Sequence, residues 1–198
     1  MSSETIPSFE PPVLLAAMPQ IVDPFFNRSV VLLVEHQSEG SLGFIVNRPT
    51  GLLVGEVLDG LAIEWRGRAE RYTYFGGPVQ PQLGTILFEE GAVELDDPDE
   101  STVIAAPGIR LSQNIGILER IAHDPPESFR LILGYAGWGE GQLEEELRRN
   151  DWLIIPVDTD LVFSRDTDSI WKRTLASIGV DPGLLPSWTR ESDPGQAN

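Results

Sequence analysis

Cysteine is missing from all 198 residues of the chain, and its absence removes several kinds of chemistry at once. Without thiols there is no disulfide bond, no thiolate zinc site, no iron–sulfur cluster and no cysteine nucleophile. Histidine is scarce as well, because only His36 and His123 are present and no spacing supports a metal site built on them. We therefore expect neither a bound metal nor another cofactor.

Basic residues and long apolar runs are also in short supply. The chain has 14 Lys and Arg residues against 31 Asp and Glu residues, a net charge of −17, and its apolar runs, such as residues 30–34, have the length of strands. Crossing a bilayer takes roughly 20 apolar residues, and phosphate backbones are bound by clustered basic residues. Residues 1–12 also lack the features of a signal peptide. We expect a cytoplasmic protein that neither enters a membrane nor reads DNA directly.

The segment WRGRAER is the best local exception to the negative charge. Arg66, Arg68 and Arg71 stand there against Glu64 and Glu70, which gives the segment a net charge of +1. An excess this small does not form a nucleic-acid-binding surface.

Length and apolar content predict one folded domain. A chain of 198 residues with 41% hydrophobic residues can build one sizeable core and is short for two. Residues 1–12 are polar and contain prolines, so we expect a flexible N-terminal arm, and we expect a flexible C-terminal tail at residues 187–198. The predicted domain covers residues 13–186.

Strand-like and helix-like segments are mixed along this domain, which indicates an α+β fold. Strands are expected at residues 29–35, 41–46, 72–75, 84–88, 129–135 and 152–157. Helices are expected at residues 53–61, after Ser112 as a cap, from Gln142, and from about residue 166 to Gly179. The stretch GGPVQPQL predicts a turn, and the acid-rich residues 89–100 predict a solvated connection.

Four sequence segments carry a resemblance to a known family. They are AMPQIVDPFFNRSVVLLVEH, GFIVNRP, YFGGPV and GYAGWGEGQLEEEL, and in this order and spacing they resemble the YqgE/AlgH family from about Leu14 to Val180. The resemblance implies an irregular α+β fold with a bifurcated, partly barrel-like mixed sheet flanked by helices. Members are often labelled transcriptional regulators, after a proposed role in alginate synthesis, but the family brings no defined activity.

The chain departs from the family pattern at one position. Many members carry a histidine after the strand that we place at residues 84–87, and Phe88 stands there in this sequence. The resemblance therefore carries over no mechanism that needs this histidine.

Glu35 and His36 look like an acid/base pair, because a carboxylate can orient an imidazole for proton transfer. Adjacent residues of a strand point to opposite faces, however, so these two side chains cannot meet through their own strand. The alternative is that both are polar residues where a buried strand meets a turn. We favour this second interpretation.

Polar residues also gather at the open end of the predicted hairpin. If the hairpin closes over residues 37–40, Val30 lies opposite Asn47, and Arg28 and Arg48 lie close by with Asp23. These groups could grip an anion. Alternatively, Arg28 pairs with Asp23 to fix a turn while Asn47 caps the strand end.

The glycine-rich segments supply the remaining candidates. The stretch GYAGWGEGQ misses the G-x-G-x-x-G pattern, and acids crowd the start of the helix that follows, so we do not expect it to cradle a phosphate. Its aromatic residues either pack beneath a tight turn or form a recognition surface. The hypothesis is one concave site for a ligand or partner, formed by Asp23, Arg28, Asn47, Arg48, Gly76, Gly77, Tyr135, Trp138 and Gln142.

No catalytic signature stands out from this sequence, and no G-x-S-x-G or phosphate-loop pattern is present. The leading hypothesis is a binding or regulatory protein that acts through an unidentified protein partner or small-molecule ligand. The alternative is an enzyme of unrecognised type that acts on an anionic small molecule at the same residues. Catalytic residues are not assigned.

Overall fold

The structure is a computed structural model that describes residues 9–95 and 102–185. Its strands are β1 (Val13–Ala17), β2 (Val30–Gln37), β3 (Gly40–Ile45), β4 (Pro49–Leu53), β5 (Tyr72–Phe75), β6 (Val79–Glu89), β7 (Val103–Ala106), β8 (Ile109–Ser112), β9 (Phe129–Gly139) and β10 (Trp152–Ile155). Its helices are α1 (Val54–Asp59), α3 (Ile115–His123), α4 (Gln142–Arg148), α5 (Thr159–Val162), α6 (Thr167–Ser177) and the 3-10 turn η1 (Pro182–Leu184). Predictions for residues 1–8, 96–101 and 186–198 lie outside the described residues.

The strands join into one sheet that branches at β9. The main order is β10-β1-β2-β3-β9-β6-β8-β7, and β5 with β4 forms a side branch. Residues 136–139 of β9 pair with β3, whereas residues 132–133 run parallel to β5 on the same edge. The opposite edge of β9 pairs with β6. This branching confirms the predicted α+β fold with a bifurcated mixed sheet.

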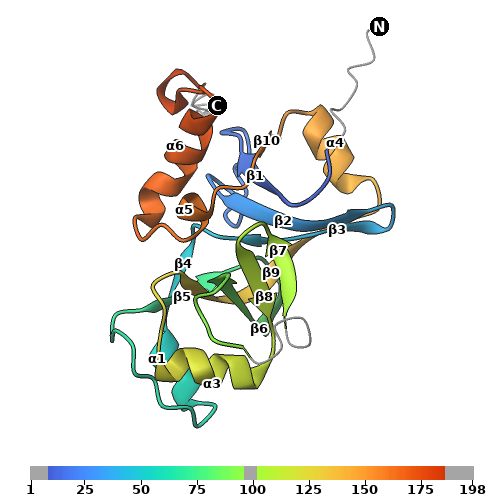
Figure 1. The fold of residues 1–198 in the computed structure, drawn as a ribbon. Coiled ribbons are helices and arrows are strands. Elements are labelled where there is room, and N and C mark those ends of the chain that lie inside the picture. The colour runs from blue at the N-terminus through green and yellow to red at the C-terminus, as the bar shows by residue number, and fades with distance from the viewer. Residues whose placement is uncertain (1–8, 96–101, 186–198) are drawn as a thin grey trace, which may run out of the picture.

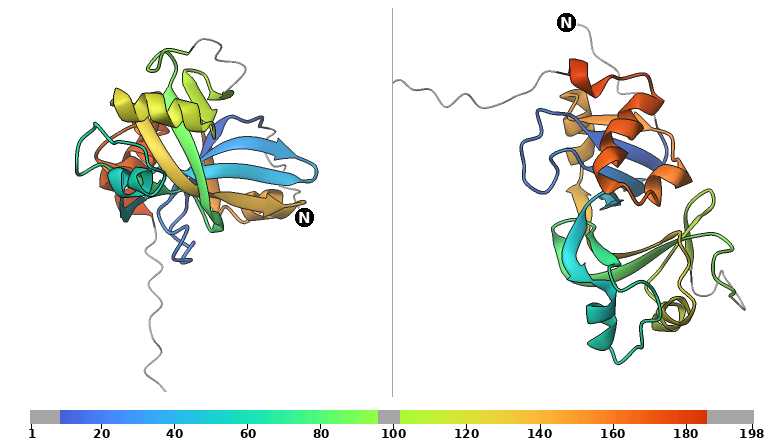
Figure 2. Two further views of the ribbon diagram at one scale, coloured as in Figure 1. Left: turned by 90° about the horizontal axis from the view of Figure 1, so that it is seen from below. Right: turned by 90° about the vertical axis from the view of Figure 1, so that its left-hand side faces the viewer.

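Helices cover both ends of the sheet. Helices α5 and α6 lie over β1 and β2 at one end, and α1 and α3 lie at the other end beyond β6 and β9 (Figure 1). Helix α4 packs beside β9, β3 and β10. Figure 2 shows β9 passing between the two ends. Among the described residues, no helix is long and apolar enough to cross a membrane.

The predicted hairpin forms as β2 and β3, but its register changes along its length. Gln37 lies opposite Gly40 as expected, and the pairing then shifts by one residue between Leu33 and Glu35. This is a β-bulge, which places one extra residue in one of the two strands. As a result Val31 lies opposite Ile45, and the predicted pairing of Val30 with Asn47 is wrong by one position.

The glycine-rich segments are largely strand rather than loop. Strand β6 begins at Val79 within the predicted GGPVQPQL turn, and β9 continues past Tyr135 to Gly139. At Gly77 a Cβ atom would lie 2.3 Å from the backbone of Tyr135, so two backbones approach each other there and only glycine fits. The glycines therefore serve strand packing, and Trp138 is buried rather than displayed.

One further local prediction is wrong, and four strands were not predicted. Asn114, not Ser112, caps α3, and its side chain accepts a hydrogen bond from the backbone N–H of Gly116. Ile115 at the start of α3 and Ile178 after α6 are exposed, although both are apolar. Strands β1, β4, β7 and β8, of four or five residues each, were missed.

Candidate functional site

Four of the predicted residues lie together at the open end of the hairpin, but most of their polar atoms form hydrogen bonds with the backbone. The group is Asp23, Arg28, Asn47 and Arg48. Asn47 accepts a hydrogen bond from the backbone N–H of Val30 at 2.8 Å and donates one to the carbonyl of Arg28 at 2.9 Å. Arg48 donates to the carbonyls of Pro24 and Asn27 at 2.5 and 2.6 Å. Burial lowers the pKa of Arg48.

Asp23 and Arg28 also have local roles in the structure. The Asp23 carboxylate accepts hydrogen bonds from the backbone N–H groups of Phe25 and Phe26, which closes the turn that follows it. The Arg28 guanidinium lies over the ring of Trp171, 5.6 Å from its centroid. Arg28 thus turns toward α6, and the ion pair with Asp23 that one interpretation required does not form in this part of the structure.

The other predicted residues lie elsewhere. Tyr135 and Trp138 line a shallow cavity beside the hairpin, whereas Arg28 lines a different cavity beside Trp171. Gln142 accepts a hydrogen bond from the backbone N–H of Gly139 and donates one to Glu146. The predicted cationic and aromatic residues are therefore not brought into one of these cavities.

A Ser–His–Glu arrangement is present at the hairpin tip. The Nδ1 atom of His36 lies 2.7 Å from the Ser41 hydroxyl, and its Nε2 atom lies 3.8 Å from a Glu144 carboxylate oxygen. Phe9 stacks on the imidazole with a centroid distance of 4.8 Å, and Ser41 is buried. Glu35 pairs with Leu42 while His36 pairs with Ser41, so the two acid/base candidates point to opposite faces. The enclosed arrangement fits a structural hydrogen bond better than a nucleophile awaiting a substrate.

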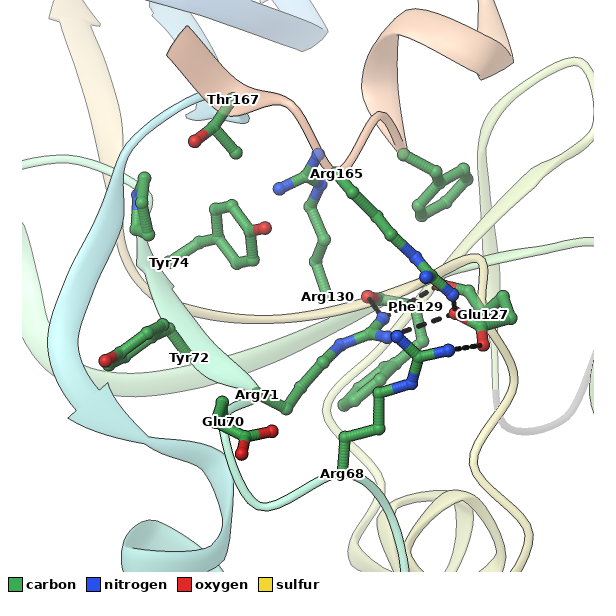
Figure 3. Close-up of a pocket in the computed structure, with 12 residues that line it drawn as sticks. Arg68, Glu70, Arg71, Tyr72, Tyr74, Glu127, Phe129, Arg130, Arg165 and Thr167 are labelled. Atoms are coloured by element: carbon green, nitrogen blue, oxygen red, sulfur yellow. Dashed lines mark hydrogen bonds and ion pairs between the residues drawn. The ribbon is translucent and has the colours of Figure 1, made fainter.

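A cavity of about 270 Å³ contains a cluster of arginines that was not predicted (Figure 3). We call it the arginine pocket. Its lining residues are Pro49, Arg68, Glu70, Arg71, Tyr72, Tyr74, Glu127, Phe129, Arg130, Phe163, Arg165 and Thr167. They come from the start of β4, the loop before β5 and β5 itself, the loop before β9 and its start, and the segment between α5 and α6 with the first residue of α6.

Arg130 is the most deeply buried charged residue of the pocket. The residue is 2% exposed, and its guanidinium donates to the carbonyls of Val162 at 2.5 Å and Ser164 at 2.8 Å. The guanidinium carbon lies 3.9 Å from the centroid of the Tyr74 ring. Its Nη1 atom has no hydrogen-bond partner, and no ion pair joins it to a carboxylate of the described residues. Burial lowers the pKa of Arg130 to about 10.

Three further arginines surround Glu127 (Figure 3). A carboxylate oxygen of Glu127 lies 3.1 Å from Arg68 and another lies 3.8 Å from Arg71, and Arg165 also forms an ion pair with it. Arg71 is held by hydrogen bonds to the carbonyls of Glu127 and Phe129. Burial lowers the pKa of Arg71, and the charges of Arg165 and Arg68 add to this effect.

Comparison with known proteins places the chain in a family. The model of the AlgH-like family, DUF179, matches residues 14–183. This chain belongs to the AlgH-like family. It is 40% identical to a UPF0301 protein of Myxococcus xanthus, over 88% of this chain and 93% of that one. It is 38% identical to a UPF0301 protein of Anaeromyxobacter dehalogenans, over 86% of this chain and 89% of that one.

Solved structures agree with this assignment. The solution structure of the AlgH protein from Pseudomonas aeruginosa matches with a TM-score of 0.71 and 34% identity over 100% of both chains. A crystal structure of protein DIP2367 from Corynebacterium diphtheriae matches with a TM-score of 0.71 and 23% identity, over 90% of this chain and 91% of that one. The second likeness supports the fold alone.

The pocket has the opposite charge to the rest of this AlgH-like protein. Four arginines and two glutamates line it, a net charge of +2 within a chain of net charge −17. Such a local excess of one sign focuses the electric field and attracts ligands of the other sign. No cluster of three metal-binding side chains is found in the described ranges.

The pocket was not predicted from the sequence, although two of its arginines stand in a segment with a small positive charge. Arg68 and Arg71 belong to the segment WRGRAER, whose charge excess is too small to predict a nucleic-acid surface. A clearer signal was Arg130, an arginine inside the apolar strand FRLIL, because a charged residue in a buried strand is rare unless it has a partner. The approach of Arg165 depends on the path of the chain between α5 and α6, which no local pattern indicates.

Proposed function

We propose that this protein binds a small anionic ligand in the arginine pocket, and that it works as a binding or regulatory protein of the cytoplasm. The observation that carries the proposal is the buried guanidinium of Arg130, which lacks both a carboxylate partner among the described residues and a hydrogen-bond partner at Nη1.

The physical argument is one of charge compensation. A buried charge is unfavourable unless it is paired and hydrogen-bonded. Arg130 meets two backbone carbonyls and the face of Tyr74, which compensate it only in part. An anion in the cavity that Arg130 lines would supply the missing opposite charge. The other arginines that line the cavity would hold the same anion by charge-assisted hydrogen bonds.

The cavity size and the overall charge favour a small molecule over a nucleic acid. About 270 Å³ lies just below the usual range of small-molecule sites, which begins at roughly 300 Å³. A net charge of −17 opposes the approach of a phosphate backbone. An enzyme acting on an anionic small molecule would use the same pocket, but no nucleophile-and-base pair in its lining favours this alternative.

The test is a melting screen with anionic metabolites on the wild type and on the double variant Arg68→Gln/Arg165→Gln. Both side chains are more than half exposed, so the variant should fold. We expect at least one carboxylate or phosphate compound to raise the Tm of the wild type and not that of the variant. Arg66→Gln removes one positive charge from a neighbouring exposed position outside the pocket and is the control. A ligand that shifts the Tm of all three proteins equally would contradict the proposed site.

A further inference from the structure

Glu127 forms ion pairs with three of the four arginines of the pocket. Its carboxylate is contacted by Arg68 and Arg71 from the loop before β5, and by Arg165 from the segment before α6 (Figure 3). These arginines come from distant parts of the chain and converge on one carboxylate. The Glu127 side chain is 59% exposed and lies in the loop between α3 and β9, so it can swing away without leaving a hole.

We propose that the arginine pocket takes a dianionic phosphate group, either a phosphate monoester or phosphate itself, and that this group displaces Glu127 from the arginines. This inference rests on the proposed function, because it names the ligand class of the same pocket.

Charge balance favours a dianion. With Glu127 displaced, the four arginines exceed Glu70 by three positive charges. A ligand with one negative charge would offset only one of them, whereas a dianion offsets two and leaves one positive charge, which the displaced Glu127 can still screen from nearby. Arg71 and Arg130 are both buried enough for their pKa to fall, which makes an opposite charge nearby more effective than at an exposed site.

Geometry favours a ligand with a phosphate group over a ligand with a carboxylate group. Guanidinium groups form paired hydrogen bonds with phosphate oxygens, and several arginines can share one phosphate because it offers three terminal oxygens. Arg71 is fixed by its bonds to two backbone carbonyls, whereas Arg68 and Arg165 have 61% and 56% of their side chains exposed. Arg130 is likewise fixed by bonds to two carbonyls, so the pocket offers two fixed and two adjustable arginines.

Aromatic walls leave room for an organic part beside the phosphate. Tyr72, Tyr74, Phe129 and Phe163 all line the cavity. The ring of Tyr74 already lies against Arg130, and Arg71 lies over Phe129 at 5.3 Å. A planar organic group could pack against these walls, so an ester is expected to bind more tightly than free phosphate.

The pH dependence of binding distinguishes a dianion from a monoanion. The charged and titratable groups that line the pocket are Arg68, Glu70, Arg71, Tyr72, Tyr74, Glu127, Arg130 and Arg165, with no histidine among them. The second pKa of a phosphate monoester is about 6. A site that takes the dianion should therefore bind phenyl phosphate about fourfold more weakly at pH 5.5 than at pH 7.5.

The experiment is isothermal titration of the full chain with phenyl phosphate, inorganic phosphate and benzenesulfonate, a monoanion that carries the same ring. We expect the fourfold pH effect for phenyl phosphate and none for benzenesulfonate. Glu127→Gln removes the internal competitor and should tighten phenyl phosphate binding about fivefold, the weight of one exposed ion pair. Glu64→Gln, which removes an exposed carboxylate paired with Arg66 outside the pocket, should leave the affinity unchanged.

Several outcomes separate the inference from the proposed function. Equal affinity for benzenesulfonate and phenyl phosphate at both pH values would contradict the preference for a dianion. Unchanged or weaker binding of phenyl phosphate to Glu127→Gln would contradict the claim that the ligand displaces Glu127. If none of a broad set of anions binds the wild type or Glu127→Gln, the proposed function itself fails. Tighter binding of phenyl phosphate than of inorganic phosphate assigns the site to an ester, and the reverse order assigns it to free phosphate.

Discussion

Two arginine-containing groups in this protein look alike in composition and differ in what their donors contact. At the open end of the hairpin, Arg48 donates hydrogen bonds to two carbonyls of the preceding loop. Asn47 donates to the carbonyl of Arg28 and accepts from the N–H of Val30, and Arg28 lies over Trp171. In the arginine pocket, Arg130 is buried with a free Nη1 atom, and Glu127 is shared among its neighbours. A cluster of polar residues indicates a binding site only when some of its hydrogen-bond donors are not already used in bonds within the protein.

The largest effect should come from removing the buried guanidinium of the pocket. Arg130→Met is expected to abolish the stabilisation by ligand, which for the wild type should reach about 2.7 kcal/mol at a ligand concentration of 100 times Kd. Urea denaturation with and without phenyl phosphate measures this difference. Arg66→Gln should keep the full stabilisation. If Arg130→Met kept it too, the two arginine groups would not differ in the way described.

The hairpin group should give the reverse result. Asn47→Ala leaves the buried N–H of Val30 without its acceptor, which should cost about 1–3 kcal/mol of unfolding free energy. Ligand binding should stay as in the wild type, because Asn47 does not line the pocket. Urea denaturation and calorimetry on the same preparation measure the two quantities. Loss of ligand binding in a stably folded Asn47→Ala protein would indicate that the ligand binds at the hairpin group and not in the arginine pocket.

The smallest effect concerns the charge of Arg130 in the unliganded protein. Burial lowers its pKa to about 10 in the folded protein, below the value in the unfolded chain, so as the pH rises through 10 the unfolded chain binds more protons and stability rises with pH. Between pH 9 and 10.5 the wild type should therefore gain about 1 kcal/mol relative to Arg130→Met. Subtracting the unfolding free energy of Arg130→Met from that of the wild type at each pH removes the contribution of other titrating groups. If this difference did not change with pH, the Arg130 charge would already be compensated in the folded protein.

Local pattern was enough to predict much of the fold. The hairpin of β2 and β3, the strand cores of β5, β6, β9 and β10, and the helices α3, α4 and α6 follow from apolar periodicity and turn residues. The bulge near Val34 and the extension of β9 to Gly139 could not be predicted, because they depend on pairing with distant strands. Strands β7 and β8 were missed, although β5 and β10 have the same length of four residues and were predicted.

The candidate site was much harder to predict than the fold. Arg68 and Arg71 are neighbours in sequence, but Arg130 and Arg165 join them only through the path of the folded chain. The predicted cleft combined residues that the structure assigns to different cavities, since Arg28 faces Trp171 and Trp138 is buried beside Glu146. Sequence spacing indicates which residues are polar, whereas the fold decides which of them keep unused donors.

The position of β9 in the middle of the sheet has a consequence for synthesis on the ribosome. Strand β3 ends at Ile45, and residues 136–139, which cover its free edge, are made only after another ninety or so residues. At roughly 5–20 residues per second, that edge waits for about 5–20 s. Unpaired strand edges invite association with other chains. The β2–β3 hairpin is therefore exposed until the ribosome has synthesised β9, the strand that also carries Arg130. Ribosome stalling before residue 139 would leave both the sheet and the arginine pocket incomplete.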